Sequence, residues 1–181
     1  MRLEACVVSV LSWSPPTMKK FPALAAALAA IPLAAVALTP TIAAAETLHE
    51  ITVTIEKVKA ADRIDNFSRG DFYARVTIDG DRQNTPFVRQ NAEITPNWQI
   101  SKKVKPGKYD VKVEIFDKDV SVDDKVDINR LGNKRDLDFA VDTRKCRITG
   151  FAQTYKCGQT ITRTGSEKKA AELSFKVTVK K

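Results

Sequence analysis

The sequence predicts one all-β domain, an antiparallel β-sandwich, preceded by an export signal. Three observations support this prediction. Apolar and polar residues alternate with a period of two in several short segments, turn-forming pairs separate these segments, and no stretch after Glu46 keeps a helical period beyond about two turns. The best helical candidate, residues 165–173, is too short to join parallel strands. About seven or eight short strands without crossover helices favour an antiparallel sandwich.

Each predicted strand shows this alternation on its own. In residues 49–55, Ile51, Val53 and Ile55 share one face while polar residues occupy the other. The same pattern predicts further strands in residues 72–78, 109–115, 137–141 and 173–179. Turns are predicted at Asp79-Gly80, Pro106-Gly107 and Cys157-Gly158.

The N-terminal region has the layout of a secretory signal. Residues 18–45 contain two lysines, an Ala/Leu-rich apolar stretch and a run of small residues ending at Ala45. A membrane anchor is the alternative, but Pro32 and Pro40 interrupt the apolar stretch and no basic cluster follows it. Residues 1–17 are interpreted as an upstream extension from a misassigned start, and residues 46–181 as a single domain. We therefore expect a bacterial-type protein that is periplasmic or secreted.

Composition narrows the function classes. The net charge is +8, but no series of aromatic residues interleaves the lysines, so nucleic-acid binding is not expected. One histidine in 181 residues disfavours zinc sites and most acid/base enzymes, and the sequence lacks a G-x-S-x-G or a Gly-rich phosphate loop. We therefore expect a protein that is not an enzyme. His49, on the apolar face of its strand, is interpreted as a core residue.

Two cysteines fall in the predicted domain. Cys146 and Cys157 have strand-like sequence on both sides, and export would place them in an oxidising compartment. A disulfide across a hairpin is expected. A metal site built on this pair would lack further Cys or His ligands.

Two acidic segments interrupt the basic chain, each after a predicted strand. Residues 62–71 form the first, and residues 117–127 hold five aspartates in eleven positions. If loops from two strands meet at one end of the sandwich, these carboxylates repel each other by about 4 kcal/mol per pair at close range unless a cation lies among them. Oxygen ligands on flexible loops suit Ca²⁺. The alternative is that each segment is a solvated turn, because aspartate bonds readily to its own backbone.

Three sequence elements resemble those of C2 domains, in the order of that family. Residues 65–76 resemble the first calcium loop and second strand, with two aspartates six apart before an aromatic strand. Residues 95–98, Thr-Pro-Asn-Trp, resemble the N-P-x-W element. Residues 113–124 resemble the third loop, with its D-x-D motif and a later aspartate. The resemblance covers about residues 48–127.

This resemblance implies an eight-stranded Greek-key sandwich that binds Ca²⁺ and attaches to anionic phospholipid headgroups at a membrane surface. By position, the implied metal ligands are Asp65, Asp71, Asp117, Asp119 and one of Asp123 and Asp124, with Asp124 preferred. The sequence departs from the family pattern in three places, one of which is a third loop one residue shorter than usual. Phe72 stands where a proline is common, and Asp127 stands where a glycine is expected.

Two further features leave alternatives open. Phe67, Val120 and Val122 fall at predicted loop tips, where they either enter a membrane or pack against one another. The basic run Lys102, Lys103, Lys105 and Lys108, joined by Lys112, is either a headgroup patch or, as we favour, a solvated face.

Two other functions remain open. The first is a metal-free sandwich that binds an envelope protein partner, and the second is a small carbohydrate- or envelope-binding domain that uses the same calcium end.

Overall fold

The computed structural model describes residues 47–62, 70–89 and 91–181. The predicted extension, the signal peptide, Asp65 and Phe67 lie outside these residues. The described part of the chain contains twelve strands and no helix, which confirms the all-β fold class. In these same ranges no helix is long and apolar enough to cross a membrane. The best helical candidate, residues 165–173, is instead a loop over residues 165–170 and the start of a strand at Ala171.

The first of two antiparallel sheets, sheet A, is built around the first strand. Its central strand β1 pairs on one side with β12 along most of its length, and β11 pairs with the far side of β12. The other side of β1 pairs with β5 and then with β4. The strands of sheet A are β1 (His49–Ala60), β4 (Glu93–Ile94), β5 (Trp98–Val104), β11 (Thr160–Thr164) and β12 (Ala171–Lys180).

Sheet B is built around β6. One side of β6 pairs with β2, which pairs with β3, and the other side pairs with β8 and β7. A hairpin of β9 and β10 extends the sheet beyond β8. The strands of sheet B are β2 (Phe72–Ile78), β3 (Asp81–Asn84), β6 (Lys108–Asp117), β7 (Asp124–Val126), β8 (Leu137–Asp142), β9 (Arg147–Thr149) and β10 (Tyr155–Lys156).

The structure has twelve strands among the described residues where eight were expected. Part of the excess arises because two short strands share one edge of a long strand. β4 and β5 share the edge of β1 that β12 leaves open, and β7 and β8 share one side of β6. The chain crosses between sheets after β1, β3, β5 and β10, so strands distant in sequence become neighbours, as in a Greek key.

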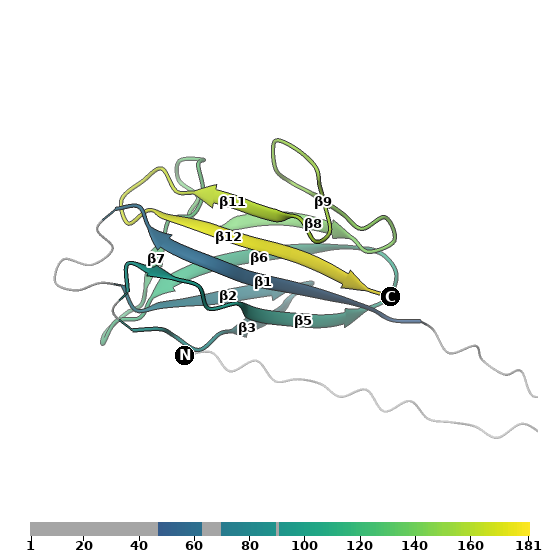
Figure 1. Cartoon of the computed structure of the whole chain (residues 1–181), viewed down its shortest axis with the longest axis horizontal. Coiled ribbons are helices and arrows are strands. Elements are labelled where there is room, and N and C mark those ends of the chain that lie inside the picture. The colour runs from purple at the N-terminus through teal and green to yellow at the C-terminus, as the bar shows by residue number, and fades with distance from the viewer. Residues whose placement is uncertain (1–46, 63–69, 90) are drawn as a thin grey trace, which may run out of the picture. The chain divides into compact units, whose positions relative to one another are not determined.

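A continuous apolar core lies between the sheets, which Figure 1 shows stacked with β1 and β12 over β6. The alternation predicted from sequence is seen directly in β12, where inward residues are buried and their neighbours are more exposed, and in β2, where only the outward Tyr73 departs from it by being buried as well. His49 is buried at the start of β1, as expected, and its Nδ1 has no hydrogen-bond partner among the described residues. The largest fully buried side chains are Phe72, Phe175, Ile51, Ile55, Ile78, Ile115, Ile128, Ile148, Ile161 and Leu173.

The predicted turns lie where the sequence places them. Asp79 and Gly80 form the two-residue loop between β2 and β3, and both have positive φ, 49° and 76°. Asp-Gly suits this geometry because a two-residue hairpin loop of this kind needs left-handed backbone at both positions. Gly107 precedes β6, and Gly158, with φ of 83°, lies between β10 and β11.

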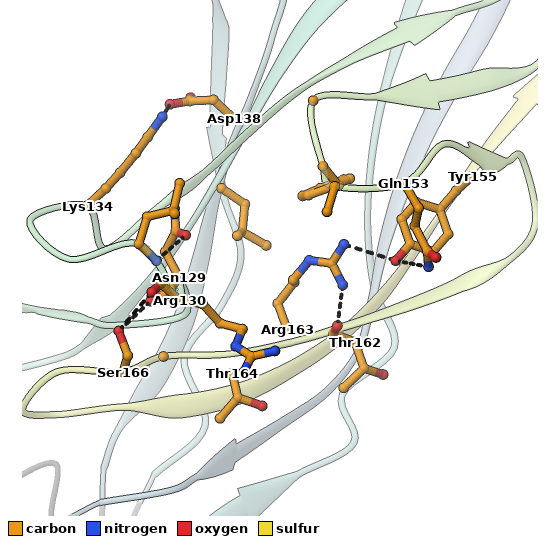
Figure 2. A pocket seen from close by; sticks show the side chains of 16 residues that line it. Asn129, Arg130, Lys134, Asp138, Gln153, Tyr155, Thr162, Arg163, Thr164 and Ser166 are labelled. Atoms are coloured by element: carbon orange, nitrogen blue, oxygen red, sulfur yellow. Dashed lines mark hydrogen bonds and ion pairs between the residues drawn. The ribbon is translucent and has the colours of Figure 1, made fainter.

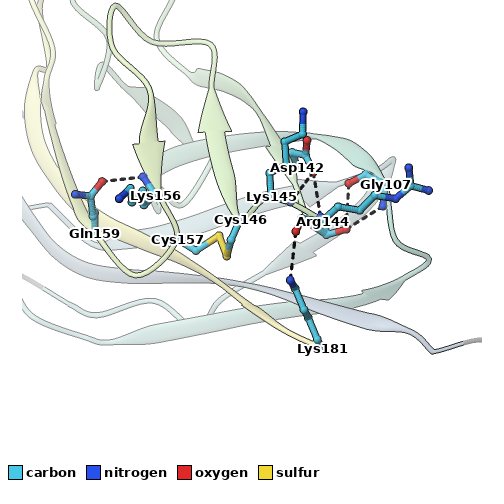
Figure 3. Close-up of a disulfide and its surroundings, with 10 residues drawn as sticks. Gly107, Asp142, Arg144, Lys145, Cys146, Lys156, Cys157, Gln159 and Lys181 are labelled. Atoms are coloured by element: carbon cyan, nitrogen blue, oxygen red, sulfur yellow. Dashed lines mark hydrogen bonds between the residues drawn. A yellow bond between two sulfur atoms is a disulfide. The ribbon is translucent and has the colours of Figure 1, made fainter.

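The predicted disulfide is present and closes the base of a hairpin. Cys146 lies directly before β9 and Cys157 directly after β10 (Figure 3). The Cys157 amide also donates to the Cys146 carbonyl at 3.1 Å. In the chain-entropy account, a bridge across so short a loop stabilises the fold by about 3 kcal/mol. The bridge therefore fixes a hairpin whose tip, residues 150–155, carries Phe151 against the core.

Candidate functional site

One end of the sandwich gathers most of the predicted ligand aspartates. Strands β1 and β6 end there, while β2, β7 and β12 begin there. Asp71 immediately precedes β2, Asp117 is the last residue of β6, and Asp124 is the first residue of β7. This is the left side of Figure 1, and we call it the aspartate end.

The register of the sheet places Asp117 and Asp124 on one face. Phe72 pairs with Asp117 and Asp117 pairs with Asp124, so these three side chains share the inner face of sheet B. Asp117 is only 3% exposed, and its Oδ1 accepts a hydrogen bond of 2.5 Å from the Asp71 amide. Two carboxylates directly opposite in a sheet destabilise it unless a cation compensates them.

A lysine supplies one such cation. The Nζ of Lys169, from the loop between β11 and β12, donates to Asp124 Oδ2. Lys169 has a positive φ of 60°, which an L residue adopts only where surrounding contacts hold it. The strands that meet at this end thus bring Lys169 beside a carboxylate forty-five residues away in sequence.

Asp123 points to the opposite face. Its Oδ2 accepts from the Tyr73 hydroxyl at 2.8 Å, and its Oδ1 accepts from Lys118 Nζ at 3.0 Å. The Tyr73 hydrogen bond, followed by the Lys118 contacts, lowers the pKa of Asp123, while burial and the bond to Asp123 raise the pKa of Tyr73 to about 12. Asp124, not Asp123, therefore shares a face with Asp117.

Removing the Tyr73 hydroxyl is expected to weaken the fold in a pH-dependent way. A lowered folded-state pKa at Asp123 gives stabilisation that is present above the usual value of 3.8 and is lost as pH falls through the lower, folded value. Tyr73→Phe should therefore unfold more easily than wild type near neutral pH, by about 1 kcal/mol. The difference in unfolding free energy between Tyr73→Phe and wild type should become smaller below pH 3.8. Urea unfolding at a series of pH values measures it, and a constant difference would contradict this role of the hydroxyl.

The remaining predicted ligand, Asp119, lies in the loop that follows β6. Its amide donates to Asp123 Oδ1 at 3.2 Å. Within residues 47–62, 70–89 and 91–181, no three acidic, histidine or cysteine side chains lie together as a ready metal cage. The available donors are carboxylate oxygens, which fit Ca²⁺ by chemistry. The aspartate end therefore provides oxygen ligands of the right type, and two of its carboxylates lie on one face. A complete metal site would require the surrounding loops to move closer together.

The tip of this loop exposes two apolar side chains. Val120 is 109% exposed and Val122 is 77% exposed relative to reference values. This excludes the alternative that the two valines are buried against each other. Apolar side chains presented at a loop tip of the aspartate end are available to a surface that receives them.

Two structural residues of this end were not predicted. Asp127 is 0% exposed, and its carboxylate accepts from the amides of Asn129, Ser166 and Glu167 at 2.7–2.9 Å. It joins the β7 segment to the loop that carries Lys169. The contacts that Asp127 makes with Ser166 and Glu167, and that Lys169 makes with Asp124, span about forty positions, so no local sequence signal marks them.

Two lysines of the basic run, Lys102 and Lys112, are engaged within the protein. Lys102 Nζ donates to the carbonyls of Ile78 and Asp79, at 3.1 and 2.8 Å. Lys112 pairs with Asp136 and Asp138, each at 3.4 Å. These contacts favour the interpretation of a solvated face that secures turns and neighbouring strands.

Comparison with known proteins identifies the fold. No protein-family model and no curated protein matches the sequence. A solved C2 domain matches with a TM-score of 0.51 and 15% identity over 74% of this chain and 99% of that one. The first C2 domain, domain A, of plant extended synaptotagmin 1 matches with a TM-score of 0.51 and 11% identity over 72% of this chain and 93% of that one.

A third match is to a much longer protein. Human GIVD cytosolic phospholipase A2, solved with a fluorophosphonate inhibitor and terbium chloride, matches with a TM-score of 0.50 and 16% identity. The match covers 74% of this chain but only 17% of the phospholipase. Together these likenesses establish that the protein has the C2-like β-sandwich fold, as the three sequence elements implied.

Proposed function

We propose that this protein is an exported, non-enzymatic C2-like module that binds Ca²⁺ at its aspartate end and thereby attaches to anionic phospholipid. The observation that carries the proposal is the pairing of Asp117 with Asp124 on one face, with the Asp71 amide bound to Asp117. Such a face attracts a hard cation because the carboxylates repel each other without one. The likeness to a C2 domain of extended synaptotagmin and to a phospholipase solved with terbium chloride supports the same proposal at the level of the fold.

In this proposal the residues of the aspartate end have distinct roles. Asp71, Asp117, Asp119 and Asp124 hold the ion, together with Asp65, and Asp123 stays with Tyr73 and orders the loop. The bound ion supplies positive charge toward a lipid phosphate. Val120 and Val122 supply apolar contact, worth roughly 1.5–3 kcal/mol each when buried.

Calcium is expected to raise the melting temperature. At a calcium concentration one hundred times the Kd, a ligand that binds only the folded state adds about 2.7 kcal/mol, which corresponds to roughly 5–10 °C for a domain of this size. Asp117→Asn/Asp119→Asn should abolish the shift, which thermal unfolding in calcium and in EDTA measures. Asp79→Asn/Asp81→Asn, in the β2–β3 turn at the other end of β2, is the matched control. A folded wild-type protein with no calcium shift would contradict the metal site.

Vesicle binding is expected to depend on the exposed valines. Val120→Asp/Val122→Asp should weaken sedimentation with phosphatidylserine vesicles at least about tenfold, because each change removes apolar contact and adds a repelled charge. The melting temperature should stay unchanged, since both side chains are exposed. Leu48→Asp, next to the opposite end of β1, is the control and should bind as wild type. Equal binding by the loop variant and the control would exclude loop insertion.

A second candidate function is a metal-free module that binds an envelope protein. The observation that favours it is the internal neutralisation of two aspartates, Asp123 by Lys118 and Asp124 by Lys169. Lys169→Met separates the candidates, because it removes the resident cation. A calcium shift in this variant alone would show that Lys169 takes the place of the ion in the native protein, whereas a shift in both forms supports the calcium module.

A further inference from the structure

A pocket in the C-terminal third of the chain contains none of the predicted calcium ligands in its lining. It has a volume of about 840 Å³ and lies between three segments that belong to different parts of the fold. The basic turn after β7 (residues 129–134), the tip of the disulfide-closed hairpin (residues 150–155) and the end of β11 (residues 162–166) form its walls (Figure 2). This volume lies within the usual range of small-molecule sites.

Arg163 is held in place at the centre of the pocket. Its guanidinium lies 4.5 Å from the ring centroid of Phe151 and 5.4 Å from that of Tyr155. It donates to the Tyr155 hydroxyl at 2.9 Å and to the Thr162 carbonyl at 2.8 Å. Two of its five N–H groups are used in this way, and the described residues accept none of the other three. Aromatic contacts and two hydrogen bonds thus fix a cation that keeps donors for a ligand.

The charge of the lining is unbalanced. Arg130, Lys134 and Arg163 face a single carboxylate, Asp138, which leaves two positive charges, three minus one. Lys134 is already paired with Asp138 at 2.6 Å. The Arg130 guanidinium has no hydrogen bond or ion pair within the described residues. Two guanidinium groups without a carboxylate partner among the described residues line this pocket, which favours an anion as its ligand.

The pocket also offers apolar surface and neutral donors. Phe151 packs on Phe139 and Phe175 of the core, so its ring forms a rigid floor, and Leu131 is 68% exposed at the rim. Gln153 donates to the Tyr155 hydroxyl, at 2.5 Å, and holds that ring in position. The disulfide closes the base of the hairpin and restrains this wall.

We propose that this pocket binds a small organic anion, with a phosphate or carboxylate group held by Arg163 and Arg130 and a ring or apolar body packed on Phe151 and Leu131. Guanidinium groups bind both kinds of oxyanion in bidentate fashion. The site uses none of the proposed calcium ligands, so it is independent of the proposed attachment to lipid.

Amide NMR titration of the protein in EDTA tests the site. The probes are phenyl phosphate and benzoate, which distinguish the two oxyanions, and benzyl alcohol, which has the ring without the charge. We expect saturable shifts at the amides of Phe151, Ala152 and Thr164 with at least one anion, and no saturation with benzyl alcohol. Absence of saturable shifts with both anions, or equal binding of the alcohol, would overturn the proposal.

Three variants assign the binding to the guanidinium groups. Arg163→Gln and Arg130→Gln should each weaken anion binding about tenfold. Arg147→Gln, an exposed arginine of the same hairpin outside the pocket, makes the same charge change and should bind as wild type. Arg130→Gln keeps the test valid if loss of the Arg163 stacking disturbs folding. An equal loss in all three variants would indicate only nonspecific charge and would overturn the site.

Discussion

Asp127→Ala is expected to lower the free energy of unfolding by about 3 kcal/mol or more. The carboxylate is fully buried and accepts three amide hydrogen bonds, from Asn129 at 2.9 Å, Ser166 at 2.8 Å and Glu167 at 2.7 Å. Truncation leaves these donors without an acceptor, and each buried unsatisfied donor costs about 1–3 kcal/mol. Urea unfolding measures the loss.

Asp138→Ala is the matched control for this prediction. The Asp138 side chain is 38% exposed, and its partners among the described residues are Lys112 and Lys134, both in ion pairs. Its removal should cost less than about 1 kcal/mol, as for other exposed pairs. Equal effects of the two substitutions would show that Asp127 does not hold the loop.

The surroundings of Asp127 explain why the family's expected glycine can be absent here. The backbone of Gly165 approaches so closely that a Cβ at that position would lie 2.2 Å from the Asp127 carbonyl oxygen. Gly165, on the loop opposite Asp127, allows this close approach. The Asp127 carboxylate then accepts from the amides of the next two residues, Ser166 and Glu167. Loss of Asp127 would also free the loop that carries Lys169, so the ionic state of the aspartate end depends on this buried carboxylate.

The sequence predicts the strands well because the information is local. Alternation in residues 72–78 reports which side chains enter the core, and the Asp79-Gly80 pair specifies a hairpin loop from its own backbone preferences. The disulfide was predictable for a similar reason, since Cys146 and Cys157 are only eleven positions apart. The division of the β1 edge between β4 and β5 was not predictable, because pairing between distant segments decides it.

The candidate site was predictable only in outline. The sequence identifies the aspartates and prefers Asp124 to Asp123 only by position in the resemblance, because a register shift of one residue exchanges the two faces of a strand. The pairing of Asp117 with Asp124 places Asp124 on the inner face of sheet B. Lys169 and Arg163 were missed because a lysine or arginine in a basic chain carries no signal until its distant partner, a carboxylate or an aromatic ring, is known.

Phe175→Ala is expected to cost about 3–5 kcal/mol, the usual loss for a buried phenylalanine. Phe175 is fully buried on β12 of sheet A, and its ring centroid lies 5.5 Å from that of Phe139 on β8 of sheet B and 6.4 Å from that of Phe151 on the hairpin. The ring therefore joins both sheets to the hairpin. A loss of this size removes a large part of the roughly 5–15 kcal/mol that stabilises a typical domain.

Thermal and urea unfolding of two further variants test this role. Phe175→Leu retains most of the apolar volume and should cost roughly 1–2 kcal/mol, and Phe87→Ala, at a side chain 41% exposed, should change stability by about 0.5 kcal/mol or less. If Phe175→Ala is no more harmful than Phe87→Ala, the aromatic cluster does not hold the sheets together. Because Phe151 rests on this ring, Phe175→Leu should also weaken anion binding in the pocket while leaving the calcium shift intact.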